Sequence, residues 1–319
     1  MWPSPAALHI PDGFLTPLIA GIGWVSAIVV IMMAIRQTNR QLGERQVPMM
    51  GILAAFVFAA QAINFPVAAG TSGHLIGAAL AAIVMGPWAA TLIMTAVVVV
   101  QGLLFQDGGL LAMGWNIMNM GVIAAFTGYL TYSLVRRLAG TARVATLAAA
   151  FAAGWISVML AAVATALELA ASGTSPLVLA AAAMAGVHAF IGIGEGLITG
   201  AAIGLLLTIR PDVIKGGEAA PGQRSASLVL AGLGIALLVA MFSPLASSSP
   251  DGLEFVAEQQ GFLGRALASP YRLLPDYTAP FVSNPALATI LAVAIGTLIV
   301  FGGAVLIGRL ATRRAATRD

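Results

Sequence analysis

The sequence predicts an all-α integral membrane protein with about nine transmembrane helices, its N-terminus outside and its C-terminus inside. Hydrophobic residues make up 60% of the 319 residues and charged residues only 8%. A soluble domain carries roughly 25% charged residues, so this composition cannot cover a water-exposed surface. The apolar residues also form long runs, and a helix of about 20 apolar residues spans a bilayer.

Nine hydrophobic segments follow one another along the chain, at 17–35, 47–64, 74–85, 88–104, 115–135, 144–170, 177–209, 226–246 and 286–308. The third segment is short. Gly86-Pro87 favours a break after it, because proline removes a helix hydrogen bond and clashes with the preceding turn. We therefore divide 74–104 into two crossings.

The basic residues orient these helices, because cytoplasmic loops carry an excess of Lys and Arg. With two crossings between 74 and 104, every Lys and Arg except Arg265 and Arg272 falls inside. One helix over 74–104 would instead scatter the basic loops across both faces. Topology thus explains the net charge of +3, which indicates no nucleic-acid partner.

The segments divide into a seven-helix body and a two-helix module. Residues 211–225 are polar and contain Gly and Pro, the composition of a linker. We predict a membrane domain over 1–210, a cytoplasmic linker over 211–225 and a module over 226–319. The module carries a polar outer loop at 247–285.

Two absences limit the chemistry of the chain. It has no cysteine, which excludes thiolate metal sites. It also has no Gly-x-x-x-x-Gly-Lys-Ser/Thr stretch, and so no recognisable nucleotide site. We therefore predict that the chain is not an enzyme and has no catalytic residues, no nucleotide site of its own and no permanent cofactor.

The chain contains three histidines, His9, His74 and His188. An isolated membrane histidine is most often an interhelical hydrogen-bond partner. His9 and His74, however, are both expected near the outer face of a chain with few polar groups. Imidazole suits Ni, Co, Cu and Zn, so the pair favours a metal site. His188 is expected about 16 Å deep in the seventh span, at 1.5 Å per residue.

Three further polar residues fall within the spans. Glu195 follows His188 by two helical turns and shares its face of the helix. An ionisable group there is a functional hypothesis by default, and the alternative is a neutral carboxylic acid hydrogen-bonded between helices. Asn116 and Asn119 lie three residues apart, a spacing that favours interhelical hydrogen bonds, with a gating role as the second interpretation.

Several motifs, in order along the chain, resemble those of one transporter family. His9-Ile10-Pro11-Asp12-Gly13-Phe14-Leu15 and Ser72-Gly73-His74-Leu75 are similar to the two histidine motifs of the CbiM/NikM family. Residues 108–121 and 188–199 also look like this family, the substrate-specific subunits of cobalt and nickel energy-coupling-factor (ECF) transporters. Pro250-Asp251-Gly252-Leu253-Glu254 resembles the PDGLE motif of the family's small partner component, here fused to the body.

The resemblance implies a mode of metal capture at the outer face. In the family the chain begins Met-His, and the terminal amine, the His amide nitrogen and the His ring nitrogen chelate one ion. A second histidine completes a square plane of nitrogen ligands, which suits Ni²⁺ and Cu²⁺. Mg²⁺ and Ca²⁺ prefer oxygen ligands. Carried over, His9 and His74 are the imidazole ligands. A second tier gates or supports the site: Asp12, Asn116, Asn119, His188 and Glu195.

The N-terminus departs from the family, since His9 does not stand at the second position. A peptide nitrogen before Leu8 is an amide and a poor ligand. One hypothesis is that Leu8 is the true initiator, translated as Met, so that the chain begins Met-His-Ile-Pro-Asp-Gly and residues 1–7 are absent. The others are proteolytic trimming and an altered site to which Asp12 contributes.

The resemblance also implies partners and a place in the cell. They are a transmembrane coupling (T) protein, two cytoplasmic ATPase (A) subunits and the lipid of a prokaryotic inner membrane. The transported ion is Ni²⁺ or Co²⁺, and the outer loop of the module assists loading. The main alternative is a stand-alone cation- or proton-coupled transporter or channel that uses His188 and Glu195. A vitamin-binding subunit of the same class and a structural scaffold are the remaining alternatives.

Overall fold

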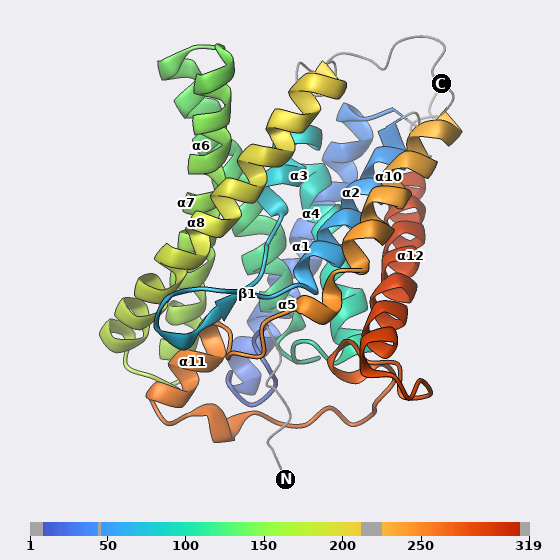
Figure 1. Ribbon diagram of the computed structural model, residues 1–319. Helices are drawn as coiled ribbons and strands as arrows, with labels where there is room; N and C mark the ends of the chain where they lie inside the picture. Colours follow the sequence, from blue (N-terminus) through green and yellow to red (C-terminus); the bar gives the residue numbers. More distant parts are fainter. Residues whose placement is uncertain (1–8, 44–45, 212–224, 313–319) are drawn as a thin grey trace.

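The computed structural model describes residues 9–43, 46–211 and 225–312, and these form one bundle of helices (Figure 1). In the described residues, seven helices are long and apolar enough to cross a membrane. The predicted all-α membrane fold is therefore confirmed, whereas the count of nine spans and the sidedness of the termini stay predictions. The seven are α1 (Pro17–Gln41), α4 with a π-helical end (Pro87–Phe105), α5 to α6 (Met113–Ala139), α7 (Arg143–Ala171), α8 (Leu177–Ile209), α10 with its following turn (Ala226–Leu245) and α12 (Pro285–Thr312).

Two further helices, α2 (Val47–Gln61) and α3 (Ala78–Met85), are shorter. At 1.5 Å per residue, α3 rises only about 12 Å, against about 30 Å for the hydrocarbon core of a bilayer. The expected break after α3 is present, because Gly86 has a φ of +82° and Pro87 begins α4. The third predicted segment thus consists of a short helix preceded by the non-helical stretch that carries His74.

That non-helical stretch is a small antiparallel hairpin between α2 and α3. Strand β1 (Phe65–Pro66) pairs with β2 (Ser72–Gly73) across a single 3₁₀ turn (Ala68–Gly70). Irregular backbone inside a membrane protein must be enclosed by protein, because lipid cannot satisfy its polar groups. Ser72, Gly73 and Ile76 are accordingly buried, whereas Pro66, Ala68 and Gly70 at the tip of the hairpin are exposed.

Close helix packing comes from small residues, as is usual in membrane bundles. Gly154 on α7 lies against the backbone of Glu195 and Gly196 on α8, where a Cβ would come within 3.0 Å of backbone atoms. Large apolar side chains instead cover the outside of the helices, where lipid would meet them. Leu18, Leu130, Val178, Leu197 and Leu306 are examples.

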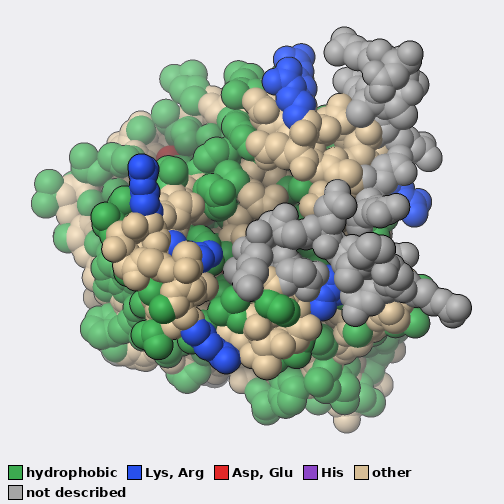
Figure 2. All heavy atoms as spheres, turned by 90° about the horizontal axis from the view of Figure 1, so that it is seen from above, with side chains coloured by type: hydrophobic (Ala, Val, Ile, Leu, Met, Phe, Trp, Pro, Cys, Tyr) green, Lys and Arg blue, Asp and Glu red, His purple; other side chains and the backbone are tan. Residues whose placement is uncertain are grey.

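The two ends of the bundle differ in charge. Arg36, Arg40, Arg136, Arg137, Arg143, Arg210 and Arg309 all stand at helix ends on one side of the bundle. Figure 2 shows the Lys and Arg side chains on this end. Helix α11 (Gly252–Gln259) lies at the opposite end, which is lower in Figure 1, and strand β1 lies between the two ends. This separation of charge is the one that the sequence predicts between inner and outer faces.

The last two long helices form one side of the bundle, since α10 and α12 both pack on α2. The segment between α10 and α12 runs across the end of the bundle where α11 lies, and α11 packs on α8. This segment also contains three 3₁₀ turns, Ser243–Leu245, Leu263–Arg265 and Pro275–Tyr277. The predicted linker at 211–225 lies almost entirely outside the described residues. The module thus contacts the body along α2 and also at α8.

Candidate metal-binding site

The segment that begins at His9 is held in place by Asn116 on α5. The Ile10 N–H donates to Asn116 Oδ1 at 3.1 Å, and Asn116 Nδ2 donates back to the Ile10 carbonyl at 3.1 Å. The Gly109 N–H donates to the same carbonyl at 2.9 Å. Both polar groups of the Ile10 backbone are therefore bound, which fixes the direction in which the neighbouring His9 side chain leaves the chain.

Asp12 anchors the next turn of this segment. Its carboxylate accepts hydrogen bonds from the backbone N–H groups of Leu110, Leu111 and Ala112, at 3.0, 2.8 and 3.1 Å. On the other side the Leu267 N–H donates to the Asp12 carbonyl at 2.8 Å. Asp12 does not line the cavity described below, so its carboxylate positions the segment instead of facing an ion.

Glu195 on α8 anchors the segment that carries His74. Its two carboxylate oxygens accept from the backbone N–H groups of Ile76 at 2.6 Å and Gly77 at 2.8 Å. Gly73, on the other side of His74, lies so close to Ile191 of α8 that a Cβ would clash with it. Glu195 therefore holds the backbone just after His74.

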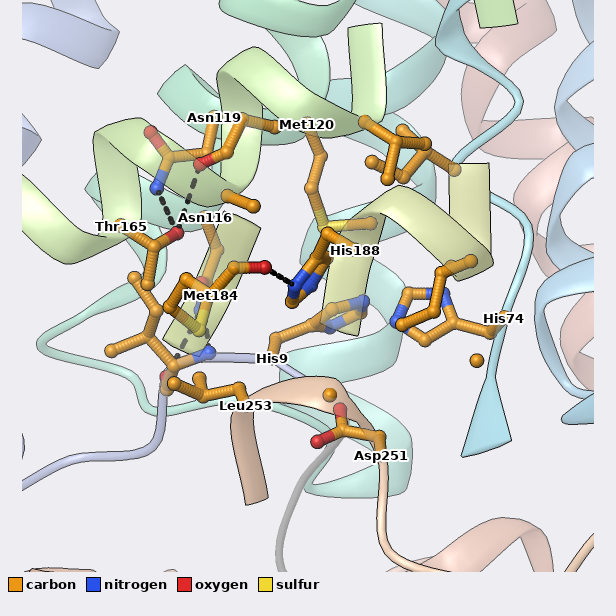
Figure 3. A pocket seen from close by; sticks show the side chains of 18 residues that line it. His9, His74, Asn116, Asn119, Met120, Thr165, Met184, His188, Asp251 and Leu253 are labelled. Carbon is orange, nitrogen blue, oxygen red and sulfur yellow. Dashed lines mark hydrogen bonds between the residues drawn. The ribbon is translucent and has the colours of Figure 1, made fainter. Parts of the chain in front are cut away.

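These two segments meet around a cavity of about 70 Å³ that all three histidines line (Figure 3). The rings of His9 and His74 lie edge to face, with centroids 5.4 Å apart and an interplanar angle of 78°. His188 faces the same space from α8. The structure thus brings together the two histidines predicted as ligands, and adds the third from the predicted second tier.

The hydrogen bonds of the three rings select their nitrogen atoms. His188 Nδ1 donates to the Met184 carbonyl at 2.8 Å, and His74 Nδ1 donates to the Leu75 carbonyl at 3.0 Å. His9 Nδ1 lies 3.3 Å from the Asp107 carbonyl, whereas His9 Nε2 is buried without a hydrogen-bond partner among the described residues. A neutral imidazole that donates from Nδ1 keeps its lone pair on Nε2, the atom that binds a metal.

The outer loop of the C-terminal module closes this cavity with Asp251, Gly252 and Leu253. The Ser72 N–H donates to the Pro250 carbonyl at 2.8 Å, and the Ser72 hydroxyl donates to the Ser249 carbonyl at 2.7 Å. Asp251 caps α11 by accepting from the Glu254 N–H at 2.6 Å, and burial raises the pKa of Asp251 well above its usual range. The loop predicted to assist loading therefore forms one wall of the site.

Asn119 lines the inner side of the cavity, next to a carboxylate that the sequence analysis missed. Asn119 Nδ2 donates to the Thr165 hydroxyl at 3.1 Å and to Glu168 Oε2 at 3.0 Å. Glu168 is 5% exposed and lies within an apolar segment of α7. The same argument that singled out Glu195, an ionisable residue inside a span, applies to Glu168.

The sequence analysis also missed a group of hydrogen-bonded polar side chains beside His9. They are Asp107, Gln61, Gln101 and Tyr277. Asp107 is 4% exposed, and one of its carboxylate oxygens lies 3.4 Å from His9 Nδ1. The sequence indicates only a turn at this position. Among the described residues, no three His, Cys, Asp or Glu side chains are grouped to hold a metal ion by themselves. A complete ligand set therefore requires donors besides these side chains.

Comparisons with known proteins identify both parts of the chain. Residues 9–213 match the CbiM family, described as the cobalt uptake substrate-specific transmembrane region, and residues 226–313 match the PDGLE domain. A chain from Archaeoglobus fulgidus, provisionally named as a fused nickel transport protein NikMN, is 36% identical over 97% of this chain and 100% of its own length. The cobalt transport protein CbiM of Sorangium cellulosum is 31% identical over 65% of this chain and 94% of its own.

A solved structure described as a truncated transition metal transporter has the same fold in the body. Its TM-score is 0.57 at 35% identity, and the match covers 63% of this chain and 98% of that chain. The CbiM match spans more than half of the chain and begins at His9, the first residue of the predicted N-terminal signature. The chain therefore belongs to the CbiM family of substrate-specific transmembrane components, and carries a PDGLE domain after its CbiM region.

Proposed function

We propose that the chain is the substrate-binding membrane subunit of an ATP-driven ECF importer for Ni²⁺ or Co²⁺. It captures the ion at the outer face with its N-terminal segment and with His9 and His74. The observation that carries this proposal is the pair of imidazoles 5.4 Å apart, of which His9 is buried and His74 is partly buried, with His9 Nε2 left without a partner among the described residues. A buried nitrogen lone pair without a donor is costly, and a metal ion would satisfy it.

The size of the cavity supports an ion as the substrate. Its volume of about 70 Å³ is small. A ligand pocket for an organic molecule has roughly 300–1,000 Å³. The cavity also has no aromatic ring besides the histidines among its lining residues, so the vitamin-binding alternative lacks both the space and the stacking surface it needs.

The donors of the cavity favour nickel over the hard cations. Imidazole nitrogens suit late first-row metals, and for a given nitrogen site Ni²⁺ binds more tightly than Co²⁺. The Archaeoglobus fulgidus relative, which also spans both parts of this chain, is provisionally named for nickel transport. We therefore propose Ni²⁺ as the preferred substrate and Co²⁺ as the second.

The remaining donors would come from the chain end next to His9. Leu8 lies outside the described residues, and its role as the initiator remains a proposal. It is supported by the family match, which begins at residue 9. A chain starting at Leu8, translated as Met, would add a terminal amine and a peptide nitrogen to the two imidazoles. These four nitrogens form the planar set that suits Ni²⁺.

The stand-alone transporter has less support. A proton relay would need His188 and Glu195 to be joined, directly or through a third group. Both oxygens of Glu195 accept from the backbone at Ile76 and Gly77, and His188 Nδ1 donates to Met184. These hydrogen bonds support a role of both side chains in holding the site over a role as a proton relay.

Energy for import would come from a T protein and two A subunits, which are expected on the arginine-rich end of the bundle. We also propose the division into a domain at 1–210, a linker at 211–225 and a module at 226–319. The module supplies a wall of the site, as the contacts of Ser72 with Ser249 and Pro250 indicate.

Transport in vesicles tests the need for partners. The chain alone, reconstituted in liposomes with an imposed proton gradient, is expected to bring internal ⁶³Ni²⁺ no higher than the external concentration. Co-reconstitution with the T and A proteins purified from the same cells is expected to give accumulation above that level only with ATP. Accumulation by the chain alone, driven by the proton gradient, would establish the stand-alone transporter instead.

A further inference from the structure

Tyr277, a residue of the C-terminal module, is inserted into the membrane body next to the site. It is 9% exposed, and its ring stacks on Phe105 with centroids 4.8 Å apart and an interplanar angle of 20°. Asp276 and Tyr277 both have positive φ, at +52° and +55°. Two consecutive non-glycine residues in this region are unfavourable, and such strain persists only where surrounding contacts impose it.

The Tyr277 hydroxyl lies within a chain of buried hydrogen bonds. It donates to Asp107 Oδ2 at 2.5 Å and accepts from Gln101 Nε2 at 3.0 Å. Gln101 Nε2 also donates to Gln61 Oε1 at 2.8 Å, and Gln61 Nε2 donates to the Ile76 carbonyl at 2.7 Å. These hydrogen bonds therefore connect Asp107 with the backbone that follows His74.

Asp107, the first residue of this series of hydrogen bonds, also contacts His9. The hydrogen bond of His9 Nδ1 goes to the Asp107 carbonyl, at 3.3 Å, and Asp107 Oδ1 lies 3.4 Å from the same nitrogen without a hydrogen bond of its own among the described residues. Within the described part of the chain, the Tyr277 hydroxyl is the hydrogen-bond donor that holds the Asp107 carboxylate. A carboxylate placed behind an imidazole fixes the ring and its tautomer and makes the opposite nitrogen a better ligand.

We propose that Tyr277 is a positioning residue for His9, acting through Asp107. The hydroxyl fixes the orientation of the Asp107 side chain. Asp107 in turn keeps His9 Nδ1 turned toward itself, so that His9 Nε2 points into the cavity. The inference rests on the proposed role of His9 as a ligand. It assigns to the module a task beyond covering the cavity, because removal of one hydroxyl of the module would disturb a ligand of the body.

Ni²⁺ affinity of the Tyr277→Phe variant tests this role. Phenylalanine keeps the stack on Phe105 and removes only the hydroxyl. The dissociation constant for Ni²⁺ is expected to rise about 10- to 100-fold, the usual effect of losing a group behind a metal ligand. Tyr271→Phe, in the same outer loop, is the matched control, since no described hydrogen bond involves its hydroxyl, and it is expected to bind Ni²⁺ as the parent does.

A double-mutant cycle separates positioning from general destabilisation. If Tyr277 acts through Asp107, then Tyr277→Phe is expected to weaken Ni²⁺ binding less than about twofold in an Asp107→Asn background, because coupled residues are not additive. The ligand-field absorption spectrum of bound Ni²⁺ is expected to change in Tyr277→Phe. The positioning role would be overturned if Tyr277→Phe lowered the melting temperature, left the Ni²⁺ spectrum unchanged, and lost Ni²⁺ affinity additively with Asp107→Asn.

His9→Ala distinguishes this inference from the function on which it rests. If His9→Ala binds Ni²⁺ like the parent, the proposed site itself is wrong. If His9→Ala loses binding while Tyr277→Phe binds like Tyr271→Phe, then only the role of Tyr277 is overturned.

Discussion

Affinity for Ni²⁺ is expected to fall by at least about 100-fold when His74 is replaced by alanine, since the loss of a direct ligand should cost no less than the loss of a group behind one. His74 supplies one of the two imidazoles that lie 5.4 Å apart in the cavity. The neighbouring residues Gly73, Ile76 and Ile191 offer no side-chain donor in its place. Calorimetric titration of the purified protein with Ni²⁺ measures the change.

Stability should change little in His74→Ala, because Glu195 still holds the backbone of Ile76 and Gly77. Glu258→Ala is the control: this side chain is exposed on α11 at the same end of the bundle, and it tests for non-specific attraction of the cation. Unchanged Ni²⁺ affinity in His74→Ala would remove His74 from the ligand set and leave His9 and His188 as the imidazoles to test.

Glu195→Gln is expected to lower the free energy of unfolding by about 1–3 kcal/mol, the cost of leaving a buried backbone donor unsatisfied. The Glu195 carboxylate is fully buried and accepts from two N–H groups. An amide has one acceptor oxygen, so one N–H would face an NH₂ group. Because the released backbone follows His74, Ni²⁺ affinity is expected to fall as well. Thermal unfolding and calorimetry measure the two effects.

The same substitution at the exposed Glu258 is the matched control, and Glu258→Gln is expected to change neither quantity. The contrary outcome is normal stability and normal Ni²⁺ affinity in Glu195→Gln together with a loss of transport. That result would assign Glu195 to proton or ion movement, as the stand-alone transporter requires.

The helices were predictable because lipid imposes a simple composition on them. Long apolar runs predicted the seven long helices, and Gly86-Pro87 predicted the break between α3 and α4, whereas the count of nine spans stays a prediction. The irregular stretch around His74 was predicted less well, since it was assigned to the start of a helix. Its backbone is held by Glu195, which is 119 residues from Ile76, and no local pattern reports such a contact.

The histidine pair was predictable from rarity and from the family motifs, but the residues behind it were not. Asp107 and Tyr277 are 170 residues apart, and each has an ordinary local explanation as a turn residue or an aromatic residue of an outer loop. Glu168 could have been noticed as an ionisable residue in an apolar segment. Asp12 was considered as a ligand, yet three backbone N–H groups bind its carboxylate.

Ni²⁺ titration of three purified chains tests most directly whether the N-terminal segment holds the ion. The chains are the full sequence, a version that starts at Leu8 as Met, and that version with His9→Ala, each with its N-terminus read by mass spectrometry. We expect tight binding by the version that starts at Leu8, and its loss with His9→Ala. We expect the same binding by the full sequence only where trimming has removed residues 1–7. Equal binding by all three, with Met1 intact on the full chain, would contradict capture by the N-terminal segment.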